Sequence, residues 1–233
     1  MTKLLLTFLM LLFTLTSNVV LSADYNKGVT AYKSGDYASA LREFKPLAEQ
    51  GDDDAQFWLG VMYDTGNGVQ QNYISAIKWY TLSAEQGDSA SQNNLGAMYR
   101  LGQGVPVNYK TAFKWYRLAA EQGLARAQTS VGTMYDQGLG VTKNYKTAIK
   151  WYILAAEQGN DRAQFNLGVS YLRGEGVIKD NIYAHMWANI SASNGHEDAV
   201  RLRDFVEESM TPANISQAQK LARECVAKNY IDC

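Results

Sequence analysis

The side chains best placed for covalent chemistry are Ser75 and Lys78, which stand three residues apart. A serine followed by a lysine at this spacing is the nucleophile motif of penicillin-interacting enzymes. The aligned positions elsewhere read Thr111-Ala112-Phe113-Lys114 and Thr147-Ala148-Ile149-Lys150, so the pattern belongs to a recurring helix. The SDN and KTG motifs that complete such enzymes do not follow. We therefore predict no catalytic residue here.

The glycine-rich turns and the two histidines are the other groups that could bind a phosphate or a metal ion. The turn Gly66-Asn67-Gly68 could cradle a phosphate, but a dinucleotide fingerprint needs a preceding strand and a third glycine. His185 and His196 do not have the spacing of zinc ligands with each other or with a cysteine. A Ser-His-Asp triad assembles only in space, and no pattern points to one. The sequence predicts no cofactor and no metal site.

The charge of the chain narrows the classes of partner. Its 22 Lys and Arg residues nearly balance 23 Asp and Glu residues, which gives a net charge of −1. Because there is no basic run or patch, nucleic acid is not expected as a partner. The clustered Lys and Arg that bind anionic lipid are also missing from the sequence.

A period of 36 residues organises most of the chain. The glycine of the first unit, Gly60, recurs as Gly96, Gly132 and Gly168, and Trp79 recurs as Trp115, Trp151 and Trp187. A fixed period of this length is the signature of a repeat architecture. Each unit contains two helical stretches separated by a glycine-rich turn, since glycine readily adopts the left-handed conformation that ends a helix. No segment alternates like a strand, so the prediction is all-α.

The repeated positions also predict how the helices begin and pack. Asp52, Asp88 and Asn160 are expected to cap the first helices, and Asn72, Asn108, Asn144 and Asp180 the second ones. Glycine inside a helix costs about 1 kcal/mol relative to alanine, so its recurrence predicts close approach of a neighbouring helix. The tryptophans recur at one helical position, which favours an interlocking core role.

The repeated unit A-Q-x-x-L-G-x-M-Y…G-x-G-V…N-Y-x-x-A-x-K-W-Y…A-A-E-Q-G resembles the Sel-1-like repeat (SLR), a relative of the tetratricopeptide repeat. The resemblance implies a right-handed α/α superhelical solenoid of helix-turn-helix repeats whose first helices line a concave surface. SLR proteins are typically adaptors, and exported bacterial members act in envelope assembly, signalling or host interaction. Some cysteine-rich members are described as β-lactamases, but these carry cysteine pairs in each repeat, which this chain lacks.

Four segments are expected along the chain. Residues 1–23 have the charged start, apolar run and small-residue end of a signal peptide, whereas a membrane anchor needs about 20 continuous apolar residues. Residues 24–51 form a shortened tetratricopeptide-like unit, and residues 52–195 hold four repeats. Residues 196–233 supply capping helices over Glu197–Glu208 and Ile215–Ala227, with a break at Thr211-Pro212. The mature protein is then exported, periplasmic or secreted from a bacterium, with no integral membrane segment.

The two cysteines, Cys225 and Cys233, both stand in the last nine residues. In an oxidising compartment they could form a disulfide that pins the tail to the last helix. Two free thiols or an intermolecular bridge are the alternatives that the sequence leaves open.

The candidate binding column is the position just before the recurring buried leucine, which is replaced by Val131 in the third unit. It reads Trp58, Asn94, Ser130 and Asn166, and so varies while its neighbours stay fixed. By analogy with tetratricopeptide grooves, an asparagine here could both donate to and accept from an extended peptide backbone. We expect these side chains to contact a protein or peptide partner.

The favoured hypothesis is a non-enzymatic exported scaffold that binds a protein or peptide on its concave face. Two alternatives come from other function classes. A weak β-lactamase or peptidoglycan-active enzyme would rely on Ser75, and an envelope glycan-binding protein would stack sugars on the tryptophans and tyrosines.

Overall fold

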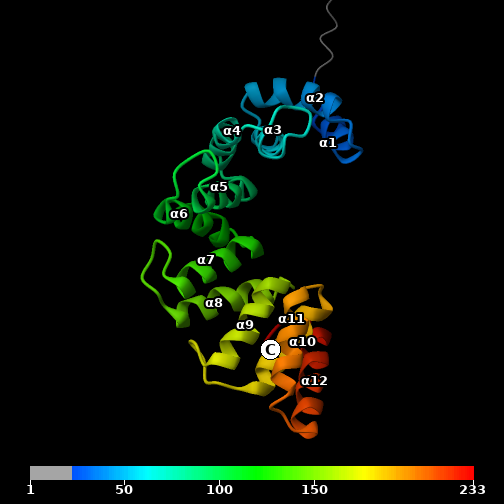
Figure 1. Cartoon of the computed structure of the whole chain (residues 1–233). Helices are drawn as coiled ribbons and strands as arrows, with labels where there is room; N and C mark the ends of the chain where they lie inside the picture. Colours follow the sequence, from blue (N-terminus) through cyan, green and yellow to red (C-terminus); the bar gives the residue numbers. More distant parts are fainter. Residues whose placement is uncertain (1–22) are drawn as a thin grey trace, which may run out of the picture.

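The computed structural model describes residues 23–233, and every regular element in that range is an α-helix. The helices form a curved stack with α1 and α2 at one end and α10 to α12 at the other (Figure 1). Helices α1 to α11 pack chiefly against their neighbours in the chain, whereas α12 packs against α10. This arrangement confirms the all-α α/α superhelical solenoid of helix-turn-helix repeats. The predicted signal peptide falls outside the described residues, apart from Ala23.

The twelve helices of this range are α1 (Tyr25–Lys33), α2 (Tyr37–Glu49), α3 (Asp53–Thr65), α4 (Tyr73–Glu85), α5 (Ser89–Leu101), α6 (Tyr109–Glu121), α7 (Ala125–Gln137), α8 (Tyr145–Ala156), α9 (Asp161–Arg173), α10 (Asn181–Ser193), α11 (Glu197–Glu207) and α12 (Pro212–Ala227). Odd-numbered helices from α3 to α9 are the first helices of the repeats, and α4 to α10 are the second ones.

The predicted caps are confirmed. Asp52 accepts a hydrogen bond from the Ala55 backbone N–H at 2.7 Å, and Asn72 accepts one from Ser75 at 3.0 Å. All the other predicted cap residues, Asp88, Asn160, Asn108, Asn144 and Asp180, make the same kind of bond. Gly66 ends α3 with a φ of 78°, in the left-handed region. These local signals fix where the helices start and stop.

The glycine inside each first helix makes room for an aromatic ring of the second helix. A Cβ atom at Gly60 would lie 2.6 Å from Cε1 of Tyr80, which is buried in the core. Gly96 and Tyr116 repeat this contact, as do Gly132 and Tyr152. The predicted close approach is confirmed, and its cause is a side chain rather than the neighbouring backbone.

In the fourth repeat a different residue fills the space next to the helix glycine. Ala188 stands where the earlier repeats have their buried tyrosine, so the ring is missing. Leu202 of α11 reaches the vacant place, because a Cβ atom at Gly168 would lie 3.2 Å from its Cδ2. The capping helix therefore completes the core of the last repeat.

The repeated tryptophans bridge successive units. Trp79 packs against the core cluster shared by α2 and α3, and Trp115 and Trp151 occupy the same place one and two repeats later. Trp187 is the most enclosed of the four, with 4% of its surface exposed. The column serves packing, as its constant helical position indicates.

A ladder of side-chain amides also links each repeat to the next, which the sequence reasoning missed. The buried Gln92 donates through Nε2 to the Ala84 carbonyl and accepts at Oε1 from Gln122, at 3.1 and 2.9 Å. Gln56, Gln128 and Gln164 occupy the same place in the other repeats, with Gln86, Gln158 and Asn194 as their donors. Asn194 stands where the earlier units have glutamine, and it keeps the amide.

The C-terminal cap differs from the prediction at one helix start. Helix α12 begins at Pro212 and not at Ile215, because Thr211 accepts a hydrogen bond from the Asn214 N–H and proline suits the first helical position. Thr211-Pro212 therefore opens the helix as well as marking the break.

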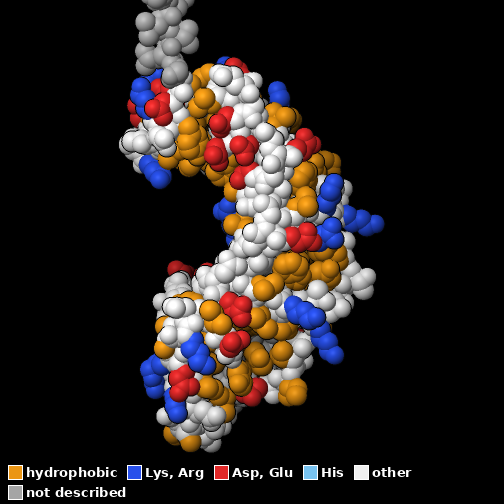
Figure 2. Space-filling model, turned by 180° about the vertical axis from the view of Figure 1, so that it is seen from behind, with side chains coloured by type: hydrophobic (Ala, Val, Ile, Leu, Met, Phe, Trp, Pro, Cys, Tyr) orange, Lys and Arg blue, Asp and Glu red, His pale blue; other side chains and the backbone are white. Residues whose placement is uncertain are grey.

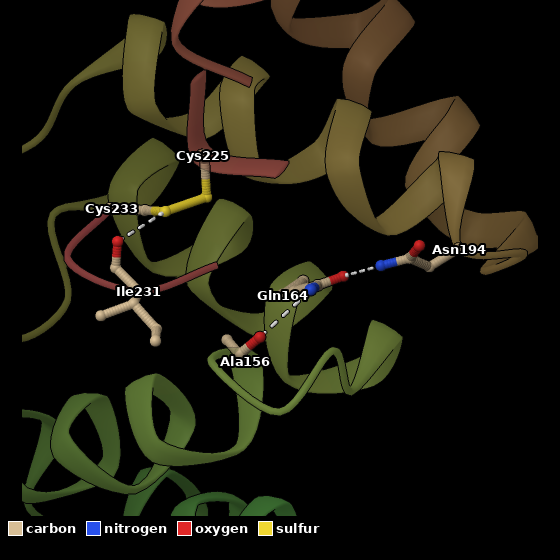
Figure 3. The surroundings of a disulfide bond; sticks show 6 residues. All are labelled: Ala156, Gln164, Asn194, Cys225, Ile231 and Cys233. Atoms are coloured by element: carbon tan, nitrogen blue, oxygen red, sulfur yellow. Dashed lines mark hydrogen bonds between the residues drawn. A yellow bond between two sulfur atoms is a disulfide. The ribbon is translucent and has the colours of Figure 1, made fainter. Parts of the chain in front are cut away.

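A disulfide joins Cys225 to Cys233, with their Cα atoms 5.4 Å apart. The tail between them turns back onto the last repeats: the hydroxyl of Tyr230 donates to Asn194 at 3.3 Å. Cys225 and Cys233 pack into the core cluster that includes Ala156 and Leu167, and Figure 3 shows the disulfide in one view with the last rung of the amide ladder. The cap is thereby fastened to the core of the fourth repeat.

Candidate functional site

First helices of successive repeats line a groove at the middle of the solenoid. We call it the central groove and define it by Asn93, Ala97 and Arg100 of α5, Arg126, Ser130 and Thr133 of α7, and Asn160 and Arg162 at the start of α9. Its volume is about 260 Å³. This is slightly below the range typical of sites that enclose a small molecule, and it suits a ligand that lays only a few side chains into the surface. Figure 2 shows the hollowed side of the curved molecule between its two ends.

Three arginines give the central groove its charge. Arg126 and Arg162 are exposed, and each is the second residue of its helix. Arg100 is half-buried, and its Nε lies 3.4 Å from the hydroxyl of Tyr116, which also lines the groove. Among residues 23–233, none of the three guanidinium groups forms an ion pair with a carboxylate. Each therefore keeps most of its five N–H donors for a ligand.

The hydroxyl groups on α7 present acceptors to the same groove. Ser130 donates its proton to the Arg126 carbonyl, and Thr133 donates to the Thr129 carbonyl, each at 3.0 Å. Because both protons are used inside the helix, each side-chain oxygen can act only as an acceptor. The Thr133 oxygen accepts from the Tyr152 hydroxyl at 3.4 Å, whereas no described residue donates to the Ser130 oxygen. The groove thus combines charged donors with neutral acceptors.

A second hollow continues the central groove toward the cap. It shares Asn160 and Arg162 with the groove and adds Phe165, Asn166 and His196. The rings of Phe165 and His196 are stacked, with centroids 4.6 Å apart. Asp161 and Asp198 also line this hollow, so the surface changes from basic to mixed charge here.

The N-terminal part of the same helix face is acidic. Asp54 occupies the position of α3 that corresponds to Arg126 in α7 and Arg162 in α9. Burial raises the pKa of Asp54, and the negative charges of Asp53 and Asp52 raise it further. The face therefore changes sign along the solenoid, from carboxylates in the first repeat to guanidinium groups in the third and fourth.

The residues of the predicted binding column do not all line one groove. Ser130 lines the central groove and Asn166 lines the second hollow. Asn94 is half-buried, accepts a hydrogen bond from Asn93 at 3.4 Å, and lines neither. The partner contact itself stays a prediction for all four residues.

Trp58 has a packing role that the column comparison missed. Its ring is stacked on Phe44 with centroids 5.7 Å apart, and its Nε1 donates to the Tyr25 hydroxyl at 3.2 Å. The ring of Tyr32 also contacts Trp58, with 4.7 Å between the two centroids. Tryptophan at this position therefore joins α3 to the shortened N-terminal unit.

The sequence reasoning also missed the arginines. The signal was present, because the column of Asp54 reads Asp, Ala, Arg and Arg through Ala90, Arg126 and Arg162. The residue type at this position varies among the repeats as much as it does in the predicted binding column. It lies one helical turn before the chosen column, so both belong to one face of the first helix.

The geometry does not assemble the chemistry that Ser75 and Lys78 could suggest. Ser75 lies in the first turn of α4, and the ammonium group of Lys78 points over the Trp79 ring, 5.4 Å from its centroid. No hydrogen bond joins the serine and lysine side chains in the described part of the chain. The serine is placed by helix capping.

The comparison with family models agrees with this geometry. The Sel1 repeat model matches residues 53–88, 89–124, 125–160 and 161–196, which is more than half of the chain. The chain belongs to the Sel1 repeat family. Proteins of this family are generally scaffolds for protein interactions, and they are typically non-enzymatic. None of the curated proteins compared matches the chain.

Solved structures of Sel1 repeat proteins share the fold. A Sel1 repeat protein from Oxalobacter formigenes is 36% identical, with a TM-score of 0.73 over 88% of this chain and 85% of that one. The protein c5321 of uropathogenic Escherichia coli, described as a protective antigen with an SLR fold, is 34% identical with a TM-score of 0.82. That match covers 88% of this chain but only 46% of c5321, so this Sel1 repeat chain spans about half of that relative. Within residues 23–233, no helix is long and apolar enough to span a bilayer.

Proposed function

We propose that this Sel1 repeat protein is a non-enzymatic scaffold, exported to the periplasm or the medium of a bacterium, that binds a protein or peptide on its concave face. The observation that carries the proposal is the central groove, where first helices of three successive repeats present unpaired arginines and hydroxyl acceptors. The role of the family as an interaction scaffold supports the same function.

Site-specific crosslinking tests the groove. A photo-reactive residue at Ser130, in the central groove, should form adducts with a partner protein in cells. The matched control carries the same residue at Lys146, an exposed position on the second helix α8. An Ala97→Trp substitution, which fills the groove, should abolish the adducts from position 130. Equal adducts from positions 130 and 146, or adducts that survive Ala97→Trp, would reject the groove as the binding surface.

Export is tested separately. The charged start at Lys3, the apolar run that follows and the small residue Ala23 support cleavage after Ala23. Mass spectrometry of the periplasmic and medium fractions should then find a mature N-terminus at Asp24. Recovery of uncleaved protein from the cytoplasm alone would contradict export without touching the groove.

A further inference from the structure

The charge of the central groove restricts what it can hold. The whole chain is almost neutral, yet Arg100, Arg126 and Arg162 converge on one surface without a carboxylate partner among residues 23–233. A surface lined by charges of one sign attracts a ligand of the opposite sign. The complementary ligand carries at least one carboxylate or another anionic group.

The geometry points to an acidic segment of a partner protein, bound in an extended conformation along the central groove. We propose this ligand class on the basis of the scaffold function above, of which it is a refinement. Its acidic side chains pair with Arg100, Arg126 and Arg162, and a backbone N–H group donates to the oxygen atom of Ser130. Charge-assisted hydrogen bonds to guanidinium groups then provide both orientation and specificity.

Arg100 is the arginine held most firmly before a ligand arrives. It is half-buried, and the Tyr116 hydroxyl accepts a hydrogen bond from its Nε. Its two terminal NH2 groups therefore remain available to a ligand. A side chain that is already ordered loses little rotational freedom on binding. Arg100 is therefore suited to a bidentate contact with one carboxylate of the segment.

The hydroxyl acceptors distinguish a peptide from an anionic polymer. Ser130 uses its proton within α7, so its oxygen presents lone pairs to a donor from the ligand. The Thr133 oxygen already accepts from Tyr152 and keeps one lone pair. A peptide backbone offers an N–H at every non-proline residue, whereas a sulfated or phosphorylated polymer presents mainly acceptors at its charged groups. Neutral acceptors between charged donors therefore favour the peptide.

Carboxylates on both sides of the three arginines also favour a peptide over an anionic polymer. Asp54 and Asp64 stand on α3, and Asp161 and Asp198 line the second hollow beyond Arg162. A uniformly charged polyanion that followed the concave surface would meet these carboxylates on both sides of the arginines. A peptide can restrict its acidic residues to the middle and place neutral or basic residues at the two ends.

Selection from a display library of random dodecapeptides tests the inference with the whole mature chain. Peptides selected on the wild type should be enriched in Asp and Glu. The double variant Arg126→Glu, Arg162→Glu should instead enrich Lys and Arg, because both positions are exposed and their reversal changes the charge of the groove without disturbing the core. The control Arg223→Glu, an exposed position on α12, should enrich the same acidic peptides as the wild type.

Fluorescence anisotropy then measures affinity with the best selected peptide and, separately, with dextran sulfate. The double variant should bind the acidic peptide at least about tenfold more weakly than the wild type, and Arg223→Glu should leave the affinity unchanged. Enrichment of neutral or basic peptides that Ala97→Trp abolishes would overturn the acidic ligand but keep the groove. No enrichment at all, or enrichment that Ala97→Trp leaves intact, would remove the groove function as well. Tighter binding of dextran sulfate than of any selected peptide would overturn the peptide in favour of a polyanion.

Discussion

The ring of Tyr80 on α4 lies directly against the backbone of Gly60 on α3, where a Cβ atom would come within 2.6 Å of Cε1. The contact sets the distance between the two helices of a repeat, because only a residue without a side chain lets the buried ring approach. Its recurrence at Gly96 and Gly132 gives three successive repeats the same geometry, on which the alignment of the groove depends.

Replacing Gly60 with alanine should destabilise the protein by about 1–3 kcal/mol. Overpacking a filled core costs about this much, and it outweighs the gain of about 1 kcal/mol in helix propensity. Urea unfolding followed by circular dichroism measures the change. The matched variant Gly168→Ala should cost less, since its nearest contacts, the Ala184 carbonyl oxygen and the flexible end of Leu202, both lie at 3.2 Å. A more stable Gly60→Ala protein would contradict the contact as the cause of the glycine.

Removing one rung of the amide ladder should also lower stability. Gln122→Ala deletes the bonds to the Gly87 carbonyl and to Oε1 of Gln92, which is buried with 4% of its surface exposed. A buried acceptor left without a donor costs about 1–3 kcal/mol. The control Gln219→Ala, at an exposed position on α12, should change the free energy of unfolding by less than about 0.5 kcal/mol. Equal effects of the two substitutions in urea unfolding would count against the ladder.

The stability contribution of Asp64 should depend on pH. Burial raises the pKa of this carboxyl, although the hydrogen bond from Tyr80 opposes the shift. Because the folded state then holds the proton more tightly than the unfolded state, the protein loses stability as pH rises from about 4 through the raised pKa. Asp64→Asn should therefore raise the urea midpoint at pH 7, and the gain should disappear at about pH 3.

Asp36 provides a control of opposite sign. Its pKa is lowered by the hydrogen bonds from the side chain and then the backbone of Ser39, at the start of α2. Its ionised form therefore adds stability that is present above about pH 4 and is lost as pH falls through the lowered pKa. Asp36→Asn should lower the urea midpoint at pH 7. If Asp36→Asn and Asp64→Asn shifted the midpoint in the same direction, the assignment of the two environments would be wrong.

Opening the disulfide should loosen the C-terminal cap. The two cysteines are separated by 8 positions in the sequence. For a loop of this length the chain-entropy model gives a stabilisation of the folded state of about 2–3 kcal/mol. The double variant Cys225→Ser, Cys233→Ser should unfold at lower urea, and amide hydrogen exchange should rise first in α12. Reduction of the wild type provides the matched comparison and should give the same midpoint as the double variant. No shift in either sample would mean that the bond does not hold the cap.

Much of the fold could be predicted from the sequence because its causes are local. The caps at Asp52 and Asn72, the left-handed turn at Gly66 and the 36-residue period depend on residues close together in the chain. These signals fix the helices and their order, and the recurring glycine correctly indicates a close contact. They do not identify which side chain makes that contact, because Tyr80 is twenty residues away from Gly60.

The candidate site was less predictable, because a groove is made by residues from different repeats. Whether Trp58 faces a partner or the N-terminal unit depends on Phe44 and Tyr25, which the column comparison does not include.

The sequence by itself determined the repeat, the helices and the family of this chain. Only the tertiary structure decided which varied positions meet in one groove: it placed Arg100, Arg126 and Arg162 in its lining together with Ser130, and left Asn94 outside that lining. The physical reason is that helix formation follows from neighbouring residues, whereas a surface and its charge arise where residues 26 and 36 positions apart are brought side by side by packing.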